Sequence, residues 1–126
     1  MTGMPFEYAV LRVVPRVDRG ECVNGAVLLY CQAAGFLGAR VRADLTCVAA
    51  LWPAADLDSI RAALATAADV AQGRADVGEA GAAEPGRRFR WLTAPRSVVI
   101  QPGPVHTGVT DDPAAELERL AQRMLG

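Results

Sequence analysis

Short runs of β-branched and aromatic residues open the chain and predict strands. Residues 6–14, "FEYAVLRVV", end at Pro15, which cannot donate to a strand ladder. After a polar link come two further strand-like runs, "CVNGAVLLYCQ" and "FLGARVRADL", which are separated by a glycine turn. Three strands joined by short links predict an antiparallel meander. The second run is apolar on both sides from Ala26 to Leu29, which predicts a central strand covered on one face by helices.

Two later segments carry apolar residues at spacings of three and four, the pattern of an amphipathic helix. The first covers residues 56–72, where Asp56 can act as the N-cap and Gly73 is the natural stop. The second starts at Asp112 and Pro113, because the aspartate can cap the helix and the proline fits its first turn. The run "LTCVAALWP" predicts a shorter helix between the strands and the first long helix.

Residues 73–86, "GRADVGEAGAAEPG", contain mainly glycine, alanine and acidic residues. They offer too little apolar surface to offset the entropy of ordering, so we expect a mobile loop inside a single domain that spans residues 1–126. Order returns at "RRFRWL", and "RSVVIQP" gives a fourth strand. The predicted fold is α+β, a four-stranded, mainly antiparallel sheet with its two main helices packed on one face.

Composition places limits on the function. The chain has 126 residues, 52% of them hydrophobic, which is enough to bury the core of one domain. Its formal net charge of −1 gives no overall field for a long nucleic-acid backbone, so nucleic acid is not an expected partner. No apolar run approaches the roughly 20 residues of a membrane span, and the start lacks the pattern of a signal peptide. We therefore expect a cytoplasmic protein without a membrane partner.

The cysteines do not indicate a metal site or a cofactor. Cys22, Cys31 and Cys47 are odd in number and contain no close pair of the zinc or redox type, so we interpret them as small buried apolar side chains. The chain also lacks a glycine-rich phosphate loop, paired histidines and a dinucleotide fingerprint. No cofactor is expected.

The arginines near residue 90 are the first candidate for binding. In an extended segment Arg88 and Arg90 would point to one face, while Phe89 and Trp91 would point to the other. Arg96 could complete an anion clamp, or the same residues could form a surface for a protein partner. The alternative is a solvated strand face beside an acidic loop, whose exposed ion pairs would contribute little.

His106 is the candidate for proton transfer, because its ordinary pKa lies near neutrality. Asp111 follows a few residues later and would be its catalytic partner. The same stretch can instead be structural, with Thr110, Asp111 and Asp112 accepting hydrogen bonds from turn and cap N–H groups.

Glu21 and Asn24 form a further candidate motif at the start of the second strand. Residues three apart lie on opposite faces of a regular strand, so these two could share a site only if a bulge at Gly25 re-aimed one of them. Otherwise Asn24 would hydrogen-bond a nearby loop and Glu21 would be solvated.

Three blocks occur in a recognisable order, "EYAVLRVVPRVDRGECVNGAVLLY", "RFRWLTAPRSVVIQPGPVHTG" and "TDDPAAELERL". Over nearly the whole chain they resemble the bacterial family catalogued as domain of unknown function 3037. The resemblance supplies no catalytic residues, because the family has no assigned activity. It implies a small standalone bacterial protein. Genes of the family are often seen beside one for a kinase-like protein of the HipA type, which suggests a partner or substrate relationship with such a protein.

Two hypotheses follow for the function. In the first, the protein is a binding or accessory module whose contact surface is the arginine- and tryptophan-rich segment, with a HipA-type protein or a second copy as partner. In the second, it is a small enzyme for a phosphate- or carboxylate-bearing substrate, in which the arginines fix the anion and His106 is the general acid or base.

Overall fold

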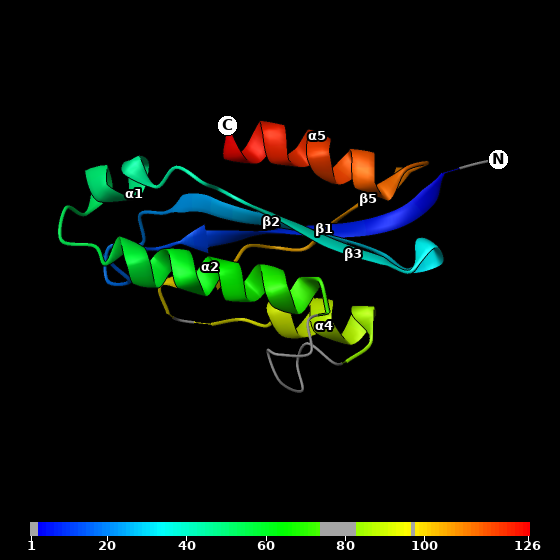
Figure 1. The fold of residues 1–126 in the computed structure, drawn as a ribbon, viewed down its shortest axis with the longest axis horizontal. Coiled ribbons are helices and arrows are strands. Elements are labelled where there is room, and N and C mark those ends of the chain that lie inside the picture. Colours follow the sequence, from blue (N-terminus) through cyan, green and yellow to red (C-terminus); the bar gives the residue numbers. More distant parts are fainter. Residues whose placement is uncertain (1–2, 74–82, 97) are drawn as a thin grey trace.

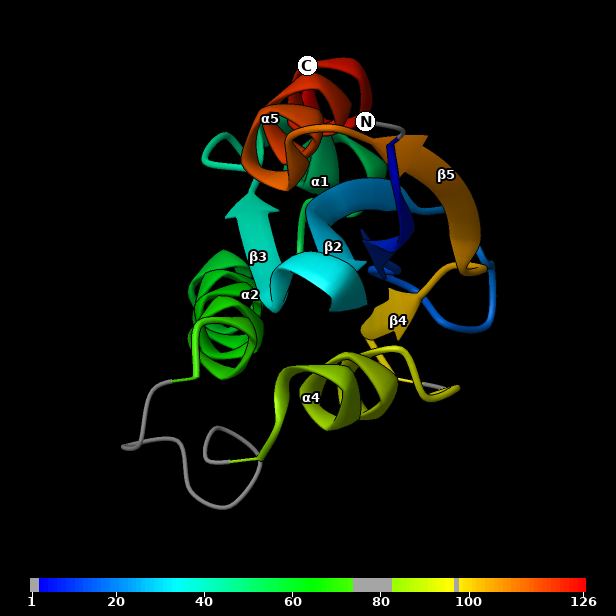
Figure 2. The same ribbon diagram turned by 90° about the vertical axis from the view of Figure 1, so that its right-hand side faces the viewer.

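The computed structural model describes residues 3–73, 83–96 and 98–126. Its centre is an antiparallel sheet of five strands, which confirms the α+β class (Figure 1). The predicted meander is present as β1 (Met4–Val13), β2 (Val23–Cys31) and β3 (Phe36–Val41). The other edge of β1 is shared by two short strands. β4 (Ile100–Pro102) pairs with its C-terminal half and β5 (His106–Thr110) with its N-terminal half (Figure 2).

The predicted helices are present with their caps. Asp56 Oδ1 accepts from the Ser59 N–H at 3.1 Å at the start of α2 (Leu57–Ala71). Asp112 Oδ1 accepts from the Ala115 N–H at 3.1 Å and begins α5 (Pro113–Leu125). The shorter elements are α1 (Thr46–Leu51), the 3-10 turn η1 (Gln32–Ala34) and α4 (Pro85–Leu92). In the part of the chain that the structure describes, none of the helices has the length and apolar character to cross a membrane.

The helices cover both faces of the sheet, so the expectation of both main helices on one face is wrong (Figure 1). Along β2, Ala26 and Leu28 point to α2 and α4, while Val27 and Leu29 point to α5. The reason lies in β2 itself, because a strand that is apolar on two sides needs cover on two sides. The larger core also includes Leu64 of α2, Phe89 of α4 and Val48 of α1, and the smaller includes Phe6, Leu117 and Leu120.

The fifth strand, β5, is absent from the sequence prediction, which stopped at four. Its sequence, "HTGVT", contains one large apolar residue and therefore gives almost no alternation signal. Gly108 has a specific role here, since an added Cβ would lie 2.6 Å from Cζ of Phe6. The Phe6 ring thus occupies the place of a side chain at the middle of β5.

The segment "RRFRWL" is helical, so the expectation of an extended run is wrong. Pro85 occupies the first turn of α4, a position that favours a helix, and the buried residues Phe89 and Leu92 are three apart. Pro85 and Gly86 therefore belong to a helix and not to the predicted loop over 73–86. Most of that loop, residues 74–82, lies outside the described residues.

A β-bulge interrupts the pairing of β1 with β2. Leu11 pairs with Ala26, but the next residue, Arg12, pairs with Asn24, which leaves Gly25 as the extra residue. A Cβ at Gly25 would lie 2.8 Å from Cγ2 of Val13 and 3.0 Å from Cδ2 of Leu64. The glycine therefore lets α2 pack closely on the bulge.

The cysteine interpretation is confirmed only in part. Cys31 is buried on β2, and Cys47 is half-buried. Cys22 is exposed, because it precedes β2 at the end of the polar link between the first two strands.

Substitution of Gly25 by alanine should destabilise the fold by about 1–3 kcal/mol, since the new methyl group meets the buried side chains of Val13 and Leu64. Urea unfolding measures the loss. Gly103→Ala is the matched control, because its Cβ would meet only the flexible end of Arg12. Equal losses in the two variants would contradict the tight fit at Gly25.

Candidate functional site

The three candidate arginines do not converge on one anion site. α4 advances 100° per residue, so Arg88 and Arg90 leave on opposite flanks of its buried face. Arg88 turns toward α2, where Nη2 donates to the Ala71 carbonyl at 3.3 Å and Nη1 donates to the Ala83 carbonyl at 2.5 Å. Arg88 therefore links the last residue of α2 to the segment just before α4.

Arg96 closes the other end of α4. Its Nη2 donates to the Trp91 carbonyl at 2.6 Å and its Nη1 to the Leu92 carbonyl at 3.3 Å. The guanidinium also lies 4.7 Å from the centroid of the Trp91 ring, within the range of a cation–π contact. Of the predicted binding residues, Arg96 and Trp91 are therefore in contact with each other, at the C-terminus of α4.

Arg90 reaches across to the sheet. Its Nη2 donates to Glu7 Oε2 at 2.7 Å, in an ion pair whose side chains are 58% and 26% exposed for Arg90 and Glu7. The hydrogen bond to Glu7 raises the pKa of Arg90 above its ordinary value, so the guanidinium stays charged.

His106 and Asp111 lie too far apart to act together. His106 begins β5, where it pairs with Tyr8, and Asp111 follows the last residue of that strand. Five residues of extended chain separate their backbones by roughly 16 Å. The imidazole is exposed and stacks on Tyr8 at 5.1 Å between ring centroids, on the face opposite Glu7 and Arg90.

Glu21 and Asn24 also stay apart, despite the bulge at Gly25. Glu21 is exposed and pairs with Arg19 at 2.9 Å in the link between β1 and β2. Asn24 Nδ2 donates to the Met124 carbonyl at 3.1 Å, in the last turn of α5. Asn24 therefore anchors the end of α5 to the sheet.

An apolar groove runs between α2 and the segment that leads into β4; we name it the tryptophan groove. One part encloses about 370 Å³ and is lined by Ala67, Trp91, Arg96 and Val98, among others. A second part of about 210 Å³ contains Trp52. Both parts are lined by Ala63, Val99 and Ile100, which makes the groove continuous from one tryptophan to the other.

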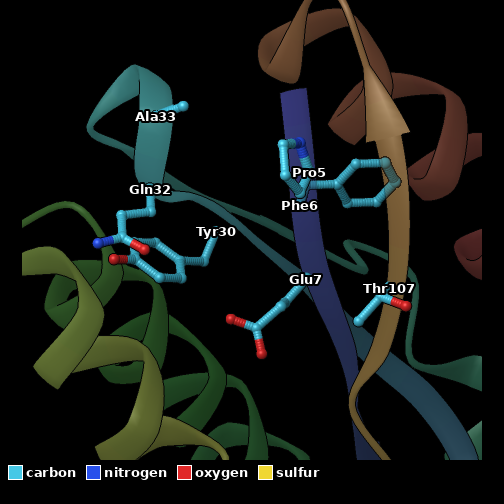
Figure 3. Close-up of a pocket in the computed structure, with 7 residues that line it drawn as sticks. All are labelled: Pro5, Phe6, Glu7, Tyr30, Gln32, Ala33 and Thr107. Carbon is cyan, nitrogen blue, oxygen red and sulfur yellow. The ribbon is translucent and has the colours of Figure 1, made fainter. Parts of the chain in front are cut away.

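A second hollow lies where the helical layer on the α4 side ends; we name it the polar pocket. It encloses about 580 Å³. Its floor is a row of side chains across three strands, because Glu7 pairs with Tyr30 of β2 on one side and with Thr107 of β5 on the other. Figure 3 shows Glu7 between these two residues, with Gln32 of η1 beside Tyr30. Pro5, Phe6 and Ala33 complete the lining.

Tyr30 is held in place by α4. Its ring stacks on Phe89 with 5.5 Å between centroids, and a Cβ on Gly86 would lie 2.8 Å from its hydroxyl oxygen. Sequence reasoning did not find the polar pocket, because its residues come from separate elements. The available signal was Glu7, the one acidic residue among the mainly apolar positions of β1.

Neither hollow resembles a metal centre. Within residues 3–73, 83–96 and 98–126, no three histidine, cysteine or acidic side chains gather closely enough to hold a metal ion.

Replacement of Arg88 by methionine should destabilise the protein by about 1–3 kcal/mol, because the carbonyls of Ala71 and Ala83 lose their donors. Thermal and urea unfolding measure this effect. Arg87→Met is the matched control, since Arg87 is exposed on the same helix. An Arg88→Met protein as stable as the control would show that these hydrogen bonds do not hold the two helices together.

The comparisons with known proteins give a family and no activity. No curated protein and no solved structure matches the chain. A family model described as "Protein of unknown function (DUF3037)" matches residues 8–125, nearly the whole length. The resemblance inferred from the three sequence blocks is therefore confirmed, and the chain belongs to this family of proteins of unknown function.

Proposed function

We propose that this protein is a bacterial, cytoplasmic accessory module that binds a protein partner through the tryptophan groove. One observation carries the proposal, the gathering of exposed apolar side chains in one place. Trp91, Val98 and Val99 are 48%, 54% and 37% exposed, and all three line the groove. Apolar surface that is concentrated in a groove, and not scattered, is typical of an interaction site.

The shape of the groove supports an extended apolar segment as its occupant. Small residues of α2, including Ala63 and Ala67, line the groove, and each of its two parts contains one tryptophan. Tryptophan and arginine are the side chains that most often dominate binding energy at protein interfaces. Each tryptophan here has an arginine over its ring, Arg16 on Trp52 at 4.5 Å and Arg96 on Trp91 at 4.7 Å.

The charges favour an acidic residue at one end of that segment. Arg16 is already paired with Asp18 at 2.7 Å. Arg96 donates only to backbone carbonyls among the described residues, so its charge has no carboxylate partner there. A partner segment with apolar side chains and an aspartate or glutamate beside Arg96 would complement the Trp91 end.

The resemblance to the family suggests a HipA-type kinase-like protein as the first partner to test. The enzyme hypothesis has less support. It needs the arginines and His106 around one hollow, whereas Arg88 and Arg96 hold the ends of helices and His106 lies on the other face of the sheet.

A photo-crosslinking residue placed at Thr66, which is exposed in the groove, should capture the partner in the bacterial host. Mass spectrometry of the adduct should identify an apolar segment with an acidic residue. With the purified partner, Trp91→Ala should weaken binding roughly 30-fold or more, the loss of about 2 kcal/mol expected at a central interface tryptophan. Isothermal titration calorimetry gives the dissociation constants.

Val17→Ala is the matched control for this test, since Val17 is also 48% exposed but lies in the link between β1 and β2, outside the groove. It should leave binding unchanged. Crosslinks of equal yield from positions 17 and 66, or equal losses from Val17→Ala and Trp91→Ala, would overturn the proposal.

A further inference from the structure

Polar side chains from four separate elements line the polar pocket, and a fifth element supplies an arginine that pairs with one of them. Glu7, Tyr30 and Thr107 come from three neighbouring strands, Gln32 comes from η1, and Arg90 reaches Glu7 from α4. The same face carries Leu11, Leu28 and other buried apolar residues where α2 and α4 cover it. The change from apolar to polar side chains occurs beyond the residues that α2 and α4 bury on this face.

The charges of this pocket balance. Glu7 supplies one negative charge and Arg90 one positive charge, in an ion pair that a solute can reach because both side chains are partly exposed. Glu7 Oε1 makes no hydrogen bond within the described residues, since Arg90 takes only Oε2. A ligand of high net charge would be attracted by one of these two groups and repelled by the other, so its net electrostatic stabilisation would be small.

The neutral groups around Glu7 can accept hydrogen bonds. The hydroxyl oxygens of Tyr30 and Thr107, the amide oxygen of Gln32 and the free carboxylate oxygen of Glu7 give the lining of this pocket four acceptors. An ammonium group has three donors and no acceptor, so it suits such a cluster. Arg90 has further N–H groups for a carboxylate, since it donates only one hydrogen bond to Glu7.

We propose that the polar pocket binds a small zwitterion with one ammonium and one carboxylate group, as in a free α-amino acid. The ammonium donates to Glu7 and its neighbouring acceptors, and the carboxylate accepts from Arg90. Pro5 and Ala33 face a small side chain of the ligand. The volume of about 580 Å³ lies in the range of small-molecule sites. This site is independent of the tryptophan groove, with which it shares no residue.

Titration of the ¹⁵N-labelled protein with each of the twenty common amino acids, followed by NMR, tests the proposal. At least one amino acid should shift the amide signals of Glu7, Tyr30, Gln32 and Thr107 together. Its N-acetyl and carboxamide derivatives should each bind about 10-fold more weakly or worse, because each lacks one of the two charges. Glu7→Gln should weaken binding of the intact amino acid by a similar factor.

Glu118→Gln is the matched control, because Glu118 also pairs with an arginine, Arg40, but lies on α5 away from the pocket. It should leave binding unchanged. Thr107→Val provides a second test if Glu7→Gln does not fold, and it should also weaken binding. The proposal fails if no amino acid shifts these four signals at up to roughly 10 mM, a dissociation constant that corresponds to only about 2.7 kcal/mol of binding free energy. It also fails if N-acetylation has no effect, or if neutral sugars shift the same signals and amino acids do not.

Discussion

β2 carries large apolar side chains on both of its faces, and neither face can be left in water. Val27, Leu28 and Leu29 are all fully buried, and burial of each such side chain stabilises the fold by about 1.5–3 kcal/mol. Two helical layers are needed to exclude water from this one strand. α5 covers one face, and α2 with α4 covers the other (Figure 1). The positions of the tryptophan groove and the polar pocket both follow from where the second layer ends.

The sequence predicts the parts of the fold that have local signals. The meander, α2 and α5 were found because apolar periodicity, caps at Asp56 and Asp112 and short links all lie within a few residues of one another. β5 and α4 were missed for different reasons. β5 depends on a contact with Phe6, which lies about a hundred residues earlier in the chain. The segment of α4 is assigned as extended in the sequence analysis, with alternate residues on opposite faces, but its buried residues Phe89 and Leu92 are three apart, as in a helix.

The candidate site shows the same division between local and long-range information. Arg88, Arg90 and Arg96 lie close together in the sequence, but they bind at three separate places. Arg88 binds the end of α2, Arg90 binds Glu7, and Arg96, which follows α4, binds carbonyls at the C-terminus of that helix. The polar pocket is a cluster only in space. Glu7 and Thr107 are neighbours because β5 returns to the first strand. Trp91 is a candidate from the sequence alone, because a large aromatic residue among arginines is conspicuous in any conformation.

The division of one sheet edge between β4 and β5 has a consequence for solubility. An unpaired strand edge can recruit another chain and seed aggregation. Here the edge is broken into strands of three and five residues. Pro102 ends the first strand and Pro104 lies in the break, and neither proline has a backbone N–H to donate. An incoming strand would therefore find no long continuous ladder to extend. The proline-rich turn lets this protein keep an open sheet edge at little risk of polymerisation.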